Sequence, residues 1–287
     1  MSRFGSASAF VQALEARFKR LEGLVTEKRQ VLAIQRFLAR VLAVRPDVIL
    51  KGGMGLKLRN PAARATKDLD LRCDGDREAN TRMLQEAARL ALDEDFMTFS
   101  VVFSKPLENV AGHRFRAECQ IAARPFSVFD VDVVGPEPLV GEIDLVVGAS
   151  WLDFAGVPTP SFRVYPIASQ IAEKVHALTL PRSGMNTRVK DLPDIALLAS
   201  LDSAVLESRT LRSALETTFA HRRTHSLPLA LPAPPAEWQG AYAEICRVNG
   251  LRWRSLADLT SAVFAFINPV LASTAEGTWS LETWVWR

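Results

Sequence analysis

A glycine pair beside a lysine and two closely spaced aspartates are the residues whose types and spacing could do phosphate chemistry in this chain. They are Lys51, Gly52, Gly53, Asp68 and Asp70. The amides of a double glycine approach phosphate oxygens without a Cβ in the way, and the start of a helix favours anions. Two carboxylates can hold Mg²⁺, which prefers oxygen ligands. The set could therefore support nucleotidyl transfer from a nucleoside triphosphate (NTP), with Mg²⁺ as the cofactor.

Short elements must position these groups. Residues 48–50 form an apolar run that predicts a strand stopped by the glycines, and residues 54–59 can restart as a helix. In residues 68–72 acids alternate with leucines, so an extended strand turns both carboxylates to one face and both leucines to the core. Taken separately, a plain turn and a solvated strand face are the simpler alternatives.

The remaining periodicity divides the chain into a mixed half and a helical half. Two amphipathic helices are expected within residues 8–44 and another over residues 77–93, with strands at 97–103, 114–122, 127–134 and 143–147. Further helices are expected at residues 167–178, 189–201, 204–218 and 256–267, with a proline-rich connector at 227–235. We therefore expect an α+β fold in two domains, residues 1–160 and 161–287.

Composition excludes several classes of protein. The 35 Lys and Arg residues nearly balance the 32 Asp and Glu residues, so any attraction to nucleic acid must come from local clusters. The three cysteines, Cys73, Cys119 and Cys246, lie too far apart for a disulfide framework or a cysteine zinc site. We find neither a secretion signal nor a long apolar segment, so we expect a cytoplasmic protein without membrane contact.

The order of strand, glycine pair, helix and Asp-Leu-Asp strand resembles the polymerase-β-type nucleotidyltransferase superfamily. The resemblance implies a polymerase-β-like core, with a mixed sheet and flanking helices, followed by a mostly helical C-terminal lobe. It also implies a third metal-binding acid on a later strand, for which we choose Asp132. Asp130 shares its strand face and is the direct competitor, while Asp144 is a more distant one. The alternative is that these acids only cap strand ends.

Four ordered motifs further resemble the AbiEii/AbiGii branch, the nucleotidyltransferase toxins of type IV toxin–antitoxin systems. They are Lys-Gly-Gly-Met-Gly-Leu at 51–56, Arg-Ala-Thr-Lys-Asp-Leu-Asp at 64–70, Lys-x-x-Ala at 174–177 and Arg-Val-Lys-Asp-Leu-Pro-Asp at 188–194. Met54 departs from the small hydroxyl residue common there, and fourteen residues, 54–67, separate Gly53 from Asp68. Residues 195–287 contribute nothing to the resemblance.

The two later motifs supply further candidates. Lys174, on a helix with an apolar stripe, could direct its ammonium to a triphosphate, or it could be an exposed lysine. Asp191 and Asp194 share one helical face and could hold Lys174 or Arg188, or act as a base on the acceptor hydroxyl. A helix N-cap is the competing interpretation of Asp191. The catalytic candidates are therefore Asp68, Asp70, Lys174 and Asp191.

The candidates for nucleotide binding come from all four motifs. Arg64 could pair with a phosphate or be solvated, and Thr66 could touch the triphosphate or only shape its loop. His176 is interpreted as a packed helix residue, and residues 279–287 as one strand packed on the helical half. The nucleotide-binding candidates are Lys51, Gly52, Gly53, Arg64, Thr66, Lys174, Arg188, Lys190 and Asp194.

The family resemblance also implies a substrate and a partner. It implies transfer of nucleotides from an NTP to RNA, foremost the 3′ acceptor end of tRNA, with release of pyrophosphate and a block of translation. It further implies a separately encoded cognate antitoxin. The alternatives are transfer to a protein hydroxyl or to a small molecule such as an aminoglycoside, and a catalytically silent binding module.

Overall fold

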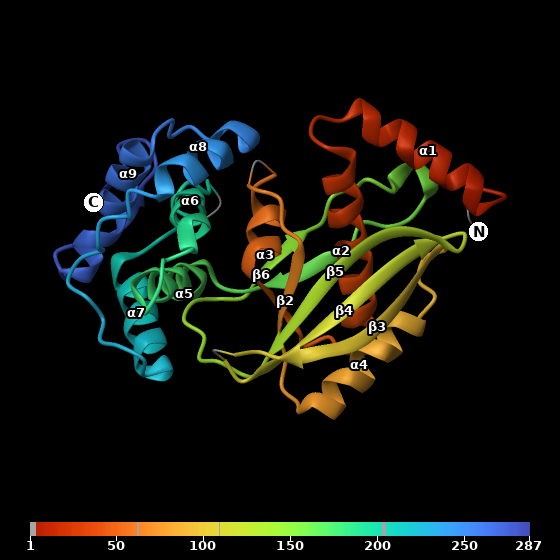
Figure 1. Ribbon diagram of the computed structural model, residues 1–287, viewed down its shortest axis with the longest axis horizontal. Coiled ribbons are helices and arrows are strands. Elements are labelled where there is room, and N and C mark those ends of the chain that lie inside the picture. Colours follow the sequence, from red (N-terminus) through yellow and green to blue (C-terminus); the bar gives the residue numbers. More distant parts are fainter. Residues whose placement is uncertain (1–3, 62, 109, 203–204) are drawn as a thin grey trace. The chain divides into compact units, whose positions relative to one another are not determined.

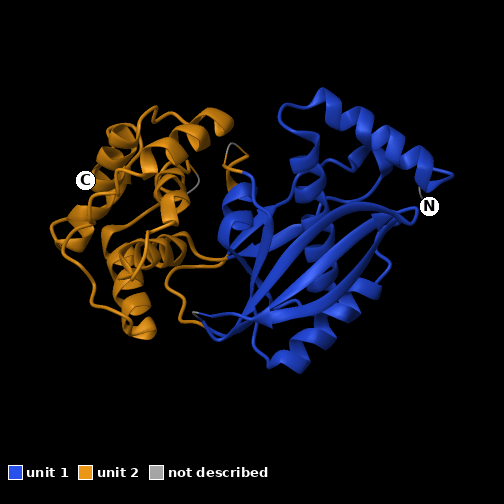
Figure 2. Cartoon of the chain, in the orientation of Figure 1, with its two compact units in different colours: residues 1–58, 65–136, 144–164 blue, residues 59–64, 137–143, 165–287 orange. Residues whose placement is uncertain are grey.

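The computed structural model describes residues 4–61, 63–108, 110–202 and 205–287, and the chain forms two compact units (Figure 2). Unit 1 comprises residues 1–58, 65–136 and 144–164, and unit 2 comprises residues 59–64, 137–143 and 165–287. The segments 59–64 and 137–143 leave the first unit and return to it. The division therefore follows the packing of the elements rather than one point in the sequence.

Unit 1 is built on a mixed seven-stranded sheet in the order β3-β4-β5-β2-β1-β7-β6 (Figure 1). Its strands are β1 Ile49–Lys51, β2 Asp68–Arg72, β3 Met97–Pro106, β4 Gly112–Ile121, β5 Arg124–Val134, β6 Asp144–Val147 and β7 Ser161–Val164. The pairs β2–β5 and β1–β7 are parallel, and the other neighbours are antiparallel. The mixed sheet confirms the expected fold class, although the strand β7 was missed.

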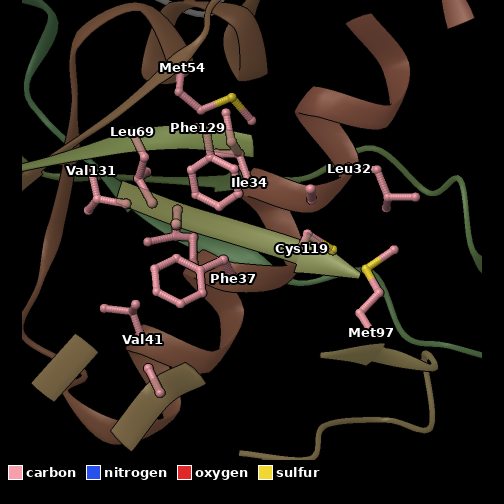
Figure 3. Packing of buried hydrophobic residues seen from close by; sticks show 14 of the residues in the cluster. Leu32, Ile34, Phe37, Val41, Met54, Leu69, Met97, Cys119, Phe129 and Val131 are labelled. Carbon is pink, nitrogen blue, oxygen red and sulfur yellow. The ribbon is translucent and has the colours of Figure 1, made fainter. Parts of the chain in front are cut away.

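Among the described residues, four α-helices pack in unit 1. They are α1 Ala7–Arg20, α2 Val25–Val44, α3 Gly52–Arg59 and α4 Arg77–Arg89. The central one, α2, is buried on all sides over residues 31–38. Phe37 of α2 lies against Phe129, with a ring-centroid distance of 5.8 Å, in the core shown in Figure 3. Its ring is also 5.3 Å from that of Phe99. The helix α4 ends at Arg89, before the predicted residue 93, because Leu90 already has the extended backbone of a C-cap, with a ψ of 120°.

A buried ion-pair network ties α2 to the loop before β3. The side chains of Arg36, Arg40 and Asp95 are 2%, 1% and 2% exposed. Arg36 donates to Asp95 Oδ2 from Nε at 2.7 Å, and Arg40 donates to both Asp95 oxygens at 2.8 Å and 2.7 Å. Such a buried carboxylate is stable only because these donors replace the water it has lost.

Unit 2 is mostly helical. Its helices are α5 Ile167–Thr179, α6 Asp191–Leu198, α7 Ser208–Arg222, α8 Trp238–Asn249 and α9 Leu256–Leu271. Residues 227–235 contain no helix or strand, which confirms the predicted connector, whereas α8 was not predicted. The predicted helix start at residue 204 lies outside the described residues.

The C-terminal segment corrects one prediction. Residues 279–287 are not a single strand but a hairpin, in which Trp279 of β8 (Trp279–Ser280) pairs with Trp286 of β9 (Val285–Trp286). Both indoles pack on Phe266 of α9, with centroids 4.8 Å and 5.4 Å away. Packing of the indoles on one helix residue accounts for the reversal, which alternation along a straight strand could not reveal.

Replacing Asp95 tests the buried network. We expect Asp95→Ala to lower the free energy of unfolding of unit 1 by about 3–5 kcal/mol. The buried guanidinium of Arg40 would lose its counter-charge, and that of Arg36 would keep only Asp93. Urea unfolding followed by far-UV circular dichroism measures this loss. Asp47→Ala is the control, since the Arg45–Asp47 pair is 35% and 60% exposed and should contribute less than about 1 kcal/mol. Equal losses in the two variants would contradict the assignment.

Candidate active site

Strand register gathers four acids on one face of the sheet in unit 1. In the parallel pair β2–β5, Asp68 lies opposite Asp130 and Asp70 lies opposite Asp132. All four acids are partly exposed, whereas the intervening residues of both strands are fully buried. The acids therefore face away from the core. This arrangement agrees with the predicted strand face and places the second predicted pair of acids beside the first.

The glycine pair lies against one of these acids. It is not a separate turn before a helix at residue 54, because α3 begins at Gly52 directly after β1; we call this strand-to-helix junction the glycine turn. Lys51 pairs with Asp70 across β1 and β2, and Gly52 follows with a φ of +64°. A Cβ on Gly52 would overlap Oδ2 of Asp70, so backbone alone fits between the helix start and the carboxylate. The side chain of Met54 is fully buried, so this departure from the family pattern serves the core and presents no group to a phosphate.

The register distinguishes the candidates for the third acid. Asp132 is level with Asp70, whose carboxylate adjoins the glycine turn, whereas Asp130 is level with Asp68. Asp144 lies on β6 at the edge of the sheet, beyond β1 and β7. This geometry supports Asp132 as the partner of Asp70.

Two arginines of β4 complete this face and were missed from the sequence. Arg114 holds both oxygens of Asp132, Nε to Oδ1 and Nη2 to Oδ2, each at 2.7 Å. Arg116 donates to Asp130 Oδ1 from Nη1 at 2.7 Å. The carboxylates, above all that of Asp132, raise the pKa of Arg114, so its guanidinium stays charged. The signal was present, because Arg-x-Arg in one strand of an antiparallel pair can match Asp-x-Asp in the next.

The donors on this face fit a divalent cation in chemistry and in strand register. Carboxylate oxygens are hard ligands, and Asp70 and Asp132 stand on neighbouring strands at the same level. Within residues 4–61, 63–108, 110–202 and 205–287, no three His, Cys, Asp or Glu side chains form a group ready to hold a metal ion. Arg114 already supplies a counter-charge to both oxygens of Asp132.

Unit 2 contains a separate buried charge cluster. Lys174 of α5 donates from Nζ to Asp191 Oδ1 at 3.1 Å and to Asp194 Oδ2 at 2.7 Å. Arg64 holds the two oxygens of Asp194 from Nε at 3.1 Å and Nη2 at 2.9 Å. Asp194 has no exposed surface. The cluster fixes the ammonium of Lys174 on a rigid support.

Charges within this cluster outweigh burial. Burial opposes ionisation of Asp194, but Lys174 and Arg64 hold the pKa of this carboxyl below its usual range. Burial likewise opposes a charge on Lys174, but Asp194 and Asp191 raise the pKa of this ammonium. Both groups are therefore ionised. Asp191 Oδ2 is buried and accepts no hydrogen bond from the described residues, and Nη1 of Arg188 lies 3.7 Å away.

The cluster decides several alternatives left open by the sequence. Lys174 is only 8% exposed, so the exposed-lysine alternative is wrong, and α6 begins at Asp191 with Lys190 as its N-cap, so Asp191 is not the cap. Arg64 is not a solvated arginine, because it forms an ion pair with Asp194. Thr66 donates to the carbonyl of Asp68 and shapes its loop.

The predicted site residues thus fall into two groups. Unit 1 contains the glycine turn with Lys51, the loop residue Thr66 and the acids of β2 and β5. Unit 2 contains the remaining candidates, of which Arg188 and Lys190 are exposed in the 3-10 turn Arg188–Lys190. These residues are Arg64, Lys174, Arg188, Lys190, Asp191 and Asp194.

His176 is packed, as expected from its place on an apolar helix face. Its ring lies 4.9 Å from Phe219 and 4.8 Å from His225, and Nε2 lies 2.8 Å from Thr224 Oγ1. Burial, with help from the charges of His225 and Arg222, lowers the pKa of His176 to about 4 from its ordinary 6.5. The folded protein therefore keeps this ring neutral in mildly acidic solution.

The stability of the folded state should depend on pH through His176. Between pH 6.5 and about 4, His176 binds a proton in the unfolded chain but stays neutral in the folded protein. The free energy of unfolding should therefore fall as the pH falls through this range, by on the order of 2 kcal/mol. Urea unfolding at several pH values measures this slope. His176→Gln should flatten it, whereas the exposed control His221→Gln should not. A wild-type slope in His176→Gln would refute the assignment.

Gly52→Ala tests the close approach to Asp70. The positive φ and the overlap with the carboxylate should both strain the turn, so we expect a loss of roughly 2 kcal/mol or more in the free energy of unfolding. Gly135→Ala is a matched control, because a Cβ at Gly135 has open space around it. Thermal unfolding of both variants compares the two positions. An unchanged midpoint in Gly52→Ala would contradict the tight fit.

Comparison with known proteins identifies the fold and the family. The fold resembles that of MenT4, a nucleotidyltransferase toxin from Mycobacterium tuberculosis, with 16% identity, a TM-score of 0.51 and 93% of each chain covered. It also aligns with JHP933 from Helicobacter pylori at 14% identity and a TM-score of 0.47, over 88% of this chain and 94% of that one. Among curated proteins, nothing matches.

The first of these likenesses supports the expected nucleotidyltransferase fold, a mixed sheet with flanking helices and a helical C-terminal part. None of the described helices is long and apolar enough to span a membrane. The family described as nucleotidyl transferase AbiEii toxin, type IV toxin–antitoxin system, matches residues 36–258. The chain therefore belongs to the AbiEii family of nucleotidyltransferase toxins.

Proposed function

We propose that this protein transfers nucleotides from an NTP to the 3′ acceptor end of tRNA, releases pyrophosphate and thereby blocks translation. The observation that carries the proposal is that Asp70 and Asp132 lie opposite each other on the neighbouring strands β2 and β5, with Gly52 directly beside the carboxylate of Asp70. A turn of bare backbone next to paired carboxylates offers both requirements of nucleotidyl transfer, a seat for phosphates and ligands for a cation.

The residues of unit 1 would bind the triphosphate and its cation. Asp68, Asp70 and Asp132 would hold Mg²⁺, which when bound supplies positive charge to the phosphates. The backbone of Gly52 and Gly53 leaves room for phosphate oxygens, and the ammonium of Lys51 adds a charge on the strand before them. These groups would stabilise the negative charge that develops on the departing pyrophosphate.

The charge cluster of unit 2 would supply two further functions. Lys174 is held charged and nearly buried by Asp191 and Asp194, so it can bind a phosphate without first being ordered. Asp191 Oδ2 has no hydrogen-bond donor among the described residues, which suits it to accept a proton from the acceptor hydroxyl. Arg64 and Asp194 would position this pair.

An RNA acceptor is supported by exposed cations in unit 2. Arg182, Arg188 and Lys190 are exposed within residues 182–190, where they can contact a phosphate backbone. Family membership supports a separately encoded antitoxin as the partner. Because tRNA is a cytoplasmic substrate, we place the activity in the cytoplasm.

Label transfer tests this function directly. Incubation with Mg²⁺, each labelled NTP and total tRNA should place the label in RNA, and Asp70→Asn should reduce the rate at least ~100-fold because a metal ligand is lost. Glu118→Gln is the matched control, since Glu118 is an exposed acid on the same sheet face but opposite Val128 rather than another acid.

Other acceptors are outcomes of the same experiment. Label in an added protein extract or in an aminoglycoside, with none in RNA, would replace the tRNA proposal by one of those acceptors. Absence of label from every acceptor would remove the proposed activity. Full activity in Asp70→Asn would remove the metal assignment.

A further inference from the structure

Arg114 occupies the carboxylate that the proposed function needs for a cation. Its Nε and Nη2 each lie 2.7 Å from one oxygen of Asp132, and the two residues are opposite each other in the antiparallel pair β4–β5. The side chains are 30% and 13% exposed, so the pair is partly shielded from water. This is the strongest geometry that a single arginine and a carboxylate can form.

The pair next to it on the same strands is weaker. Arg116 makes one hydrogen bond to Asp130, at 2.7 Å, and its side chain is 50% exposed. Arg114 also approaches Asp130, with Nη1 3.7 Å from Oδ2. Asp132, which is level with Asp70, thus has both oxygens held by Arg114. Asp130, two residues earlier, has the more exposed partner, Arg116.

A divalent cation and a guanidinium cannot use Asp132 equally well at the same time. A cation bound to these oxygens would lie close to a fixed positive charge, and the repulsion between them is large where water is partly excluded. The cation therefore has to compete with Arg114 for the carboxylate. A guanidinium released in this way keeps its charge and its planar fork, which suits the oxygens of a phosphate.

We propose that Arg114 is an exchangeable counter-ion of the third acid, which holds Asp132 until a divalent cation displaces it and is then free to bind a phosphate of the nucleotide. This inference rests on the proposed function, because that function makes Asp132 a cation ligand. It adds a positioning residue that couples binding of the cation to binding of the nucleotide. Arg116, which holds Asp130, has no such role.

Cation binding without nucleotide tests the exchange. Mn²⁺ is used in place of Mg²⁺, and its binding to the full chain is followed by electron paramagnetic resonance. Because the competing charge is gone, Arg114→Met should lower the Kd for Mn²⁺ at least ~5-fold, while Arg116→Met, which removes an equal charge two residues away, should leave it within about twofold. Asp132→Asn should weaken binding at least ~10-fold, which shows that the signal reports this carboxylate.

A second variant guards against loss of the fold. Arg114→Lys keeps the charge but has no planar fork, so its Kd should lie between those of the wild type and Arg114→Met. A nonhydrolysable NTP analogue gives an independent readout. Mn²⁺ should strengthen its binding in the wild type, and this strengthening should be smaller in Arg114→Met because the released guanidinium is missing.

The possible failures are distinguishable. If the wild-type protein binds no Mn²⁺, or if Asp132→Asn binds Mn²⁺ as tightly as the wild type does, both the metal assignment and the exchange are overturned. Wild-type binding that depends on Asp132 but does not tighten in Arg114→Met would overturn the exchange alone. Equal tightening in Arg114→Met and Arg116→Met would also overturn it, because the effect would then be one of net charge.

Discussion

The parallel register of β2 against β5 is the constraint on which the rest of unit 1 depends. Side chains alternate along a strand, so Leu69 and Leu71 reach the core only when Asp68 and Asp70 face the other way. A slip of one residue would bury carboxylates and expose leucines. Packing of α2 on the apolar face of the sheet therefore also decides where the acids stand.

The same register concentrates negative charge on the face of the sheet that points away from the core. Carboxylates on adjacent strands repel one another. Arg114 and Arg116 of β4 compensate this repulsion, because each lies in register with an acid of β5. In the core, Arg36 and Arg40 share Asp95, and Arg36 also pairs with Asp93. The difference lies in exposure, since the buried network only supports the fold, whereas the pairs on the sheet face stay accessible to an incoming cation or phosphate.

Unit 2 uses buried charge in a third way. Asp194 is fully buried and is held by Arg64 and Lys174, so it has the donors that an ionised carboxylate needs away from water. Its ionisation in turn keeps Lys174 charged. A positive charge fixed in this manner loses little freedom when it binds an anion, which is the property that transfer of a charged group requires.

By itself the sequence determined the local elements and the chemistry they carry. The alternation in residues 68–72 predicted a strand with both acids on one face, because it depends only on neighbouring residues. The glycine pair predicted the change from strand to helix, although α3 begins at Gly52 and not, as predicted, at Met54. The motifs around Lys174 and Asp191 predicted the family through their order along the chain.

Only the tertiary structure decided which distant side chains meet. Arg64 is 130 positions from Asp194, and no local pattern specifies such a pair. The alternation of Arg114 and Arg116 is visible in the sequence, but only the register of β4 against β5 sets Arg114 opposite Asp132, 18 positions away. Likewise, the reversal at residues 279–287 follows from packing on Phe266. The helix α8 differs, because Trp238, Tyr242 and Cys246 repeat at helical spacing and Gly250 ends it, so its local signal was missed. The physical reason is that periodicity records which face of an element is buried, whereas the choice of partner depends on register and packing between elements.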